Sequence, residues 1–208
     1  MDTPEFPEFF AAAPVIRMRD PLAEFLGAAA GGLIDYRYED AVRLAGHSCP
    51  TVASAFLMTR AALAALHGNN LPVRGEIRVD LREARDAGVA GVVASIAALV
   101  TGATADMGFR GLGGRFNRRD KLHFDQPLGG DLRFTRLDTG AAVDVSADLS
   151  RVPAGARLGE LMPMCLAGRA GAEQQAEFRE LWQERVRRLL TDYADDASIV
   201  TVTVAAPR

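Results

Sequence analysis

Cysteine and histidine are scarce in this chain of 208 residues, which contains two cysteines and three histidines. Cys49 and Cys165 lie far apart in the sequence, so they do not form the spaced pattern of a disulfide framework. We therefore expect both thiols to be reduced. Chemistry that depends on a thiol or an imidazole is restricted to very few positions.

The chain also lacks a basic excess and a long apolar run. Its formal net charge is −3, which argues against nucleic-acid binding as the main function, because phosphate recognition requires a clear surplus of Lys and Arg. The longest apolar segment, residues 89–100, contains Ser95 and falls short of the ~20 residues that span a bilayer. The acidic N-terminus, with Asp2 and Glu5, lacks the basic region of a signal peptide. We expect a cytoplasmic protein without a membrane or nucleic-acid partner.

Hydrophobic residues make up 49% of the sequence, enough for a sizeable core. We expect an N-terminal arm over residues 1–20 and a single α+β domain over residues 21–208. The arm offers Phe6, Phe9 and Phe10 to a groove on the body or on a second subunit. A flexible terminus is the alternative interpretation.

Hydrophobic periodicity predicts an α-β-α-β-β-β core with a mixed sheet. Its helices are expected at 50–67 and 88–101, and its strands at 76–81, 121–124, 131–137 and 141–149. The helix at 88–101 is nearly all apolar, so we expect it to be the most buried one. A C-terminal extension over residues 151–208 adds a short helix at 158–166, a long amphipathic helix at 172–193 and a strand at 199–204. Before the core, a helix at 22–26, a strand at 34–38 and a helical turn at 38–44 are expected.

The segment Gly46-His47-Ser48-Cys49-Pro50 concentrates the reactive side chains. Pro50 suits the first position of a helix, which places Cys49 at or next to the N-cap, where the helix dipole favours a thiolate. A thiolate is both a nucleophile and a metal ligand, and His47 can act as its base or as a second ligand. The structural alternative is a buried histidine that is hydrogen-bonded to a carbonyl beside an inert core cysteine.

A glycine loop follows the second core helix. Residues 102–116 include five glycines, so regular secondary structure is improbable there. Four arginines accompany it, namely Arg110, Arg115, Arg118 and Arg119. Exposed backbone N–H groups and guanidinium groups together suit phosphate or carboxylate, although the loop lacks the lysine and Ser/Thr of a P-loop. An interaction surface or a salt-bridged loop is the alternative.

Three short segments of the chain, in their order along the sequence, resemble the FmdE domain of formylmethanofuran dehydrogenase. They are Gly46-His47-Ser48-Cys49-Pro50, Thr101-Gly102-Ala103-Thr104, and Asp120-Lys121-Leu122-His123-Phe124. The resemblance covers roughly residues 35 to 150 and implies a fold similar to the second domain of glyceraldehyde-3-phosphate dehydrogenase. The family pattern His-Gly-His-x-Cys-Pro has Ala45 in place of its first histidine here, and the family pattern Thr-Gly-Cys-Thr has Ala103 in place of its cysteine.

The resemblance implies a metal site, because family members are linked to metal binding, often zinc. It makes His47 and Cys49 the candidate ligands for zinc or another divalent transition metal. Further ligands are expected from His123, Cys165 or Asp106, or from a second subunit, and Arg110 and Arg115 are candidate anion contacts.

Three functions are therefore predicted. The first is a metal-binding protein of the FmdE-like family that acts on a small anionic substrate at the His47 and Cys49 site. The second is a metal-free thiol enzyme, in which Cys49 attacks an electrophile and His47 accepts the proton. The third is a non-catalytic accessory or binding subunit. We expect a homodimer that forms through the 88–101 helix or the C-terminal helix and strand.

Overall fold

The computed structural model describes residues 6–205. The chain forms, in order, β1 (Ile16–Arg19), α1 (Pro21–Phe25), β2 (Leu33–Tyr36), α2 (Tyr38–Ala45), α3 (Pro50–His67), β3 (Ile77–Leu81), α4 (Ala90–Thr101), β4 (Leu122–His123), β5 (Leu132–Arg136), β6 (Ala142–Ala147), α5 (Ala156–Leu166), α6 (Ala172–Leu190) and β7 (Val200–Val204). Short 3₁₀ helices are η1 (Glu8–Ala12), η2 (Ala30–Gly32) and η3 (Leu149–Arg151). The predicted α+β class, with a mixed sheet and a C-terminal helix and strand, is confirmed.

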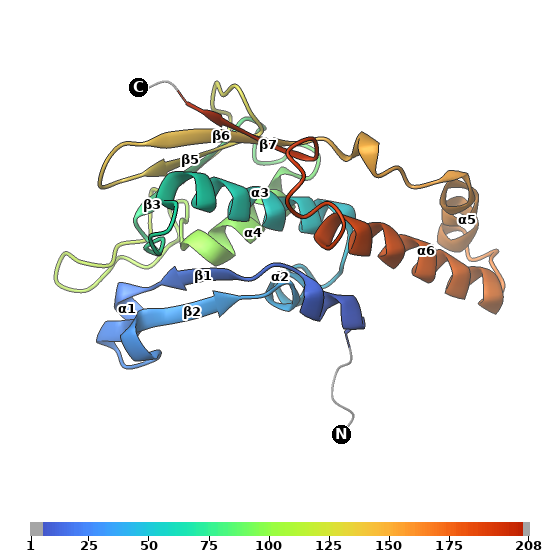
Figure 1. Cartoon of the computed structure of the whole chain (residues 1–208), viewed down its shortest axis with the longest axis horizontal. Coiled ribbons are helices and arrows are strands. Elements are labelled where there is room, and N and C mark those ends of the chain that lie inside the picture. The colour runs from blue at the N-terminus through green and yellow to red at the C-terminus, as the bar shows by residue number, and fades with distance from the viewer. Residues whose placement is uncertain (1–5, 206–208) are drawn as a thin grey trace.

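The elements form three layers (Figure 1). The upper layer is a sheet of order β4-β3-β5-β6-β7, in which β3 and β4 are parallel and the other neighbours are antiparallel. Helices α3 and α4 lie beneath it, and the antiparallel pair β1 and β2 lies beneath the helices with α2. No helix within residues 6–205 is long and apolar enough to cross a membrane.

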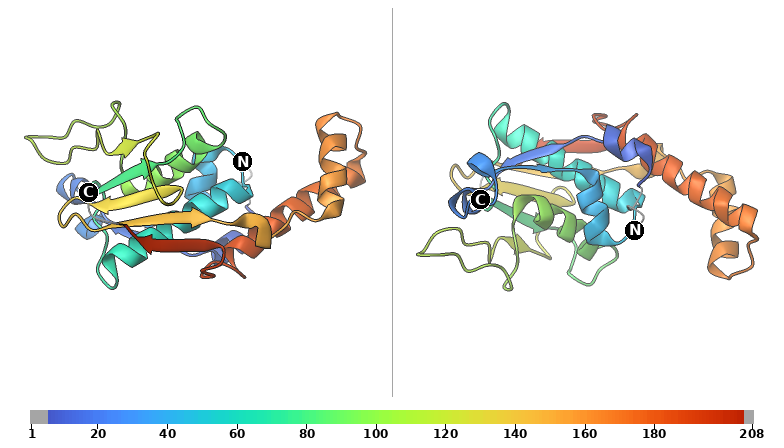
Figure 2. Two further views of the ribbon diagram at one scale, coloured as in Figure 1. Left: turned by 90° about the horizontal axis from the view of Figure 1, so that it is seen from above. Right: turned by 90° about the horizontal axis from the view of Figure 1, so that it is seen from below.

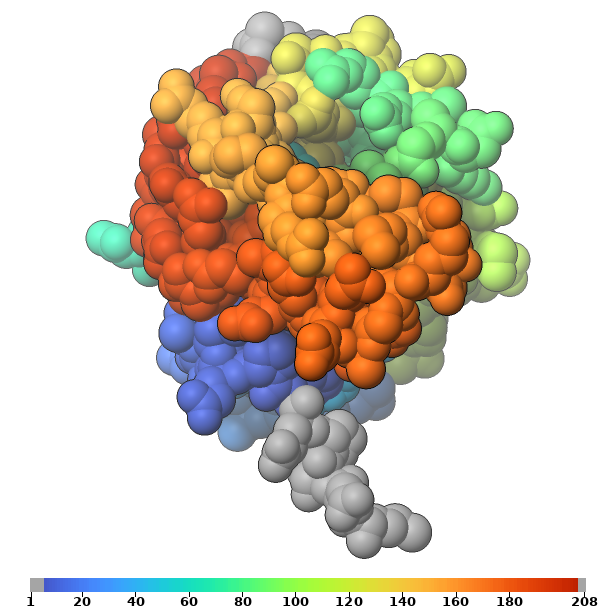
Figure 3. Space-filling model, turned by 90° about the vertical axis from the view of Figure 1, so that its right-hand side faces the viewer, coloured from blue at the N-terminus to red at the C-terminus, as the bar shows by residue number. Residues whose placement is uncertain are grey.

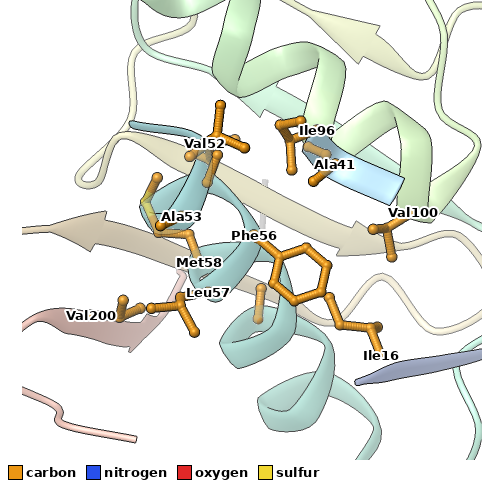
Figure 4. Close-up of a cluster of buried hydrophobic side chains, with 14 of the residues drawn as sticks. Ile16, Ala41, Val52, Ala53, Phe56, Leu57, Met58, Ile96, Val100 and Val200 are labelled. Atoms are coloured by element: carbon orange, nitrogen blue, oxygen red, sulfur yellow. The ribbon is translucent and has the colours of Figure 1, made fainter. Parts of the chain in front are cut away.

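The sequence led us to expect α4 to be the most buried helix. In the structure, α3 lies at the centre of the core instead. It is apolar on nearly every side, and its side chains reach both neighbouring layers. In Figure 4, Phe56 points toward Ile16 of β1 while Leu57 points toward Val200 of β7. Helix α4 covers the sheet beside α3 but leaves Gly91 and Ser95 exposed. A helix between two layers must be apolar all round, whereas one at the edge of a layer needs a single apolar face.

The outer face of the sheet carries a ladder of alternating charges. Asp80 of β3 pairs in register with Arg133 of β5, which pairs in register with Asp144 of β6. The guanidinium of Arg133 donates two hydrogen bonds to Asp144, of 2.7 and 2.9 Å, and Arg78 donates to Asp80 at 2.8 Å. The alternating pattern of β3 indicated a strand with one buried face. Asp80, on the other face, is only 1% exposed, so β3 is buried on both faces.

The N-terminal segment docks on the body of its own chain. Phe10 is buried and packs edge to face against Tyr38, with 4.9 Å between ring centroids, and Phe6 and Phe9 pack against the same core. Part of the predicted arm is a strand, because β1 pairs with β2. Residues 1–5 of the arm lie outside the described part of the chain.

Helices α5 and α6 form an arm that projects from one end of the molecule (Figure 2). We call residues 156–190 the α5–α6 arm. Leu158 and Leu161 of α5 are fully buried, and α5 packs along α6. Seen from that end, the arm stands in front of the body (Figure 3). After the arm the chain returns to the sheet and adds β7 as an edge strand beside β6.

We expect the charge ladder to contribute strongly to stability. Arg133→Met removes the cation that donates two hydrogen bonds to the buried carboxylate of Asp144, so the free energy of unfolding should fall by about 3 kcal/mol. Arg17→Met removes an exposed ion pair with Asp35 and should leave the free energy of unfolding nearly unchanged, because solvent screens such pairs. Urea denaturation of both variants measures this, and equal losses would contradict the ladder's role.

Candidate functional site

The segment around His47 and Cys49 joins two helices. Gly46 ends α2 in the left-handed conformation, with φ of 74°, and Cys49 is the N-cap of α3 with Pro50 in the first turn, as predicted. The Sγ atom of Cys49 accepts a hydrogen bond from the backbone N–H of Val52 at 3.4 Å, and the residue is 8% exposed. His47 is exposed, and its Nδ1 lies 2.9 Å from the carbonyl oxygen of Ala45.

Ser48, which the sequence analysis did not single out, makes the most contacts in this segment. Its carbonyl oxygen accepts hydrogen bonds from Trp182 Nε1 at 2.9 Å and from Gln183 Nε2 at 3.3 Å. Its hydroxyl donates to Gln183 Oε1 at 3.0 Å and lies 3.1 Å from the hydroxyl of Tyr38. Burial raises the pKa of Tyr38, which keeps this phenol neutral. Ser48 therefore fastens α6 to α2 and to the start of α3.

The other predicted ligands lie elsewhere. Asp106 and His123 line a separate pocket of about 300 Å³ beside the sheet edge, and Cys165 lies on the α5–α6 arm. Within residues 6–205, no three side chains of His, Cys, Asp or Glu come together in a way that could hold a metal ion. Zinc binding at His47 and Cys49 therefore stays a prediction.

His47 and Cys49 are not paired either. The ring of His47 is bonded to the Ala45 carbonyl, and the thiol of Cys49 accepts from the Val52 N–H. A nucleophile and its base lie within hydrogen-bond reach of each other, and no such bond joins these two side chains in the described structure. The contacts agree with the structural alternative only in part, because His47 bonds to a carbonyl beside the buried Cys49 but is itself exposed and not buried. The segment begins α3 and anchors the α5–α6 arm through Ser48.

A cationic pocket lies at the other end of the core. It has a volume of about 390 Å³ and is lined by Pro21, Arg74, Gly75, Glu76, Gly114, Arg115, Phe116, Asn117, Arg118 and Lys121. These residues come from the start of α1, the approach to β3 and the end of the glycine loop. Helix α3 begins directly after Cys49 and spans about 27 Å at 1.5 Å per residue. Arg74 follows the other end of this helix, which is at His67. The pocket and the segment thus lie at opposite ends of α3.

Asp20 organises the wall of the pocket. Its carboxylate caps α1 by accepting from the N–H groups of Leu22 at 2.9 Å and Ala23 at 3.3 Å. It also accepts from Arg118 Nη2 at 2.7 Å and from Arg74 Nη1 at 3.0 Å. Burial acts to raise the pKa of Asp20, but the two guanidinium groups and the capped N–H groups outweigh it, so this pKa lies below its usual value.

Arg118 is the most unusual residue of the pocket. It is only 5% exposed, and its Nη1 atom is buried without a hydrogen-bond partner among the described residues. The guanidinium lies against Gly75, whose φ of 89° favours glycine, and a side chain at Gly75 would collide with it. A Cβ at Gly102 would lie 2.9 Å from the same Nη1. Both glycines therefore leave room for Arg118.

Two further cations complete the pocket. Lys121 donates a hydrogen bond from Nζ to the carbonyl oxygen of Gly75. Burial lowers the pKa of Lys121, and the nearby carboxylate of Glu76 opposes that effect. The guanidinium of Arg115 lies over the Phe116 ring, 4.7 Å from its centroid. Four cationic side chains and a single carboxylate thus line the pocket.

The sequence pointed to this pocket only in part. Arg115, a candidate anion contact, lies in its lining, whereas Arg110 lies outside it and is exposed. Arg118 was noticed only as part of an arginine-rich loop. Arg74 was missed, because nothing in its local sequence connects it with the glycine loop. Lys121 directly follows the loop but was assigned only to the predicted strand at 121–124.

Comparison with protein-family models and with curated proteins gave no match. The resemblance to the FmdE domain of formylmethanofuran dehydrogenase therefore remains a prediction that rests on two short motifs.

The anchoring role of Ser48 can be tested against its neighbour. Ser48→Ala removes the hydroxyl contacts with Tyr38 and Gln183 and should lower the free energy of unfolding by about 1–2 kcal/mol. Cys49→Ser keeps an N-cap acceptor, so it should lower the free energy of unfolding by less than Ser48→Ala does. Chemical denaturation gives both values. If Cys49→Ser proved the more harmful change, Cys49 would have a role beyond the helix cap.

Proposed function

We propose that the protein binds a small anionic ligand in the cationic pocket. The observation that carries this proposal is the unpaired Nη1 of Arg118. A buried donor without a partner costs about 1–3 kcal/mol, more when it is charged, and such groups are rare in proteins. An anion in the pocket would supply the missing acceptor.

The surrounding side chains support an anion over a neutral ligand. Guanidinium groups match the geometry of carboxylate and phosphate oxygens, and they remain charged at all ordinary pH values. Arg74 and Arg118 share one carboxylate, Asp20, so its charge is insufficient to neutralise both. Partly buried positive charges are screened less by salt than exposed ones, which strengthens their attraction for a ligand.

The zinc and thiol functions remain separate predictions. Elemental analysis of the untagged protein beside the Cys49→Ser variant tests the first, since about one metal ion per chain that is lost in the variant would identify a site at His47 and Cys49. The rate of alkylation at Cys49 tests the thiol function, because a reactive thiol must be accessible.

Homodimerisation, a cytoplasmic location and an accessory role likewise stay predictions. Sedimentation analysis measures whether the protein is a homodimer.

We expect sulfate and inorganic phosphate to stabilise the protein, because only the folded state offers the pocket. At a concentration 100 times the Kd the gain is about 2.7 kcal/mol. Isothermal titration calorimetry at low ionic strength, with thermal unfolding alongside, measures binding and stabilisation.

Arg115→Gln and Lys121→Met should each weaken sulfate binding at least tenfold, which corresponds to about 1.4 kcal/mol. Arg110→Gln is the matched control for Arg115→Gln, since Arg110 is also an exposed arginine of the same loop but lies outside the pocket lining. An equal loss in this control would show that general attraction, and not the pocket, holds the anion.

A further inference from the structure

The charges that face the cationic pocket indicate how much negative charge its ligand carries. The cations are Arg74, Arg115, Arg118 and Lys121. The carboxylates are Glu76, in the lining, and Asp20, bonded to two of the arginines. Four cations against two carboxylates leave an excess of two positive charges. Of the nearby residues, Arg19 and Glu24 neutralise each other as an ion pair, and Tyr36 is a neutral phenol beneath Arg74. A ligand with two negative charges would balance the pocket.

The cations also converge on one place. A Cβ built on Gly102 would lie 2.9 Å from Arg118 Nη1 and 3.2 Å from Cζ of Arg74. Arg118 also packs against Gly75, whose carbonyl oxygen binds Lys121 Nζ. Arg118 therefore lies between these two glycines, with Arg74 beside Gly102 and Lys121 bound to Gly75. The three cations come from two chain segments, the approach to β3 and the end of the glycine loop. A planar carboxylate presents two oxygens, whereas a phosphoryl group presents three that point in different directions.

We propose that the ligand is a phosphomonoester dianion, an inference that rests on the proposed anion-binding function. The phosphoryl oxygens bind Arg118 Nη1, Arg74 and Lys121. The organic part of the ligand occupies the remaining space, because the volume of about 390 Å³ falls within the range of pockets for small organic molecules and exceeds what a phosphoryl group fills. Pro21 and Phe116 provide the apolar surface of the lining, so this part lies against them.

The charge of the ligand can be tested by titration between pH 5 and pH 7, with phenyl phosphate and sulfate as probes. Phosphomonoesters lose their second proton near pH 6, so the affinity for phenyl phosphate should rise about tenfold over this interval if only the dianion binds. Sulfate is a dianion throughout this interval. Its affinity therefore serves as the control, because it responds only to changes in the charge of the pocket itself, at Glu76, Asp20 or Lys121. We expect the affinity for sulfate to change less than twofold.

The organic part is tested with a second comparison. Phenyl phosphate should bind at least fivefold more tightly than inorganic phosphate at pH 7. Phe116→Asn should abolish this difference, so that phenyl phosphate and inorganic phosphate bind with equal affinity. Asparagine is a suitable replacement because Phe116 has a φ of 65°, a conformation that asparagine adopts more readily than an aromatic residue.

The outcomes separate the two proposals. If neither sulfate nor phosphate binds, the anion-binding function itself is wrong. If acetate binds as tightly as sulfate, the function stands and the assignment of a dianion is overturned. If phenyl phosphate binds no better than inorganic phosphate, or if its affinity does not change with pH, the phosphomonoester assignment fails.

Discussion

The end of the molecule that holds the cationic pocket depends on the ion pairs of the buried Asp20 carboxylate with Arg74 and Arg118. This carboxylate caps α1, and through Arg74 and Arg118 it joins α1 to the approach to β3 and to the end of the glycine loop. Arg74 extends the connection to the carbonyl oxygens of Leu99 and Val100 at the end of α4. A buried carboxylate is stable only when cations accompany it. Two guanidinium groups on one carboxylate leave positive charge to spare, so the structural requirement itself creates the cationic pocket.

Elements with a strong local pattern could be predicted from the sequence. The bounds of α3 were correct because its apolar residues recur at helical spacing and Pro50 and Gly68 mark its ends. The hairpin of β5 and β6 followed from alternation around a glycine turn. Strand β1 was missed although Ile16 and Met18 alternate with arginines, because four residues are too few to distinguish a strand from an irregular arm. Which helix is most buried depends on how the layers pack. Composition alone favoured α4, whereas the structure places α3 at the centre.

The candidate site was less predictable, because its partners are distant in sequence. Ser48 binds Trp182, 134 residues further on, and Arg118 binds Asp20, 98 residues before it. In the sequence Arg110 and Arg118 are equivalent arginines of one loop, and only the fold buries the second of them. The types of residue at His47 and Cys49 suit catalysis, metal binding and the start of a helix equally well. Their neighbours in space, and not their identities, favour the structural role.

Helix α3 separates two regions that can be studied independently. The segment at its start anchors the α5–α6 arm, while the cationic pocket lies beyond its far end. Effects of substitutions more than about 10 Å apart usually add without coupling, and α3 spans about 27 Å at 1.5 Å per residue. Substitutions near Cys49 should therefore act on the arm without altering the pocket. An effect of Cys49 on anion binding would require α3 itself to shift, and its close packing between two layers resists such a movement.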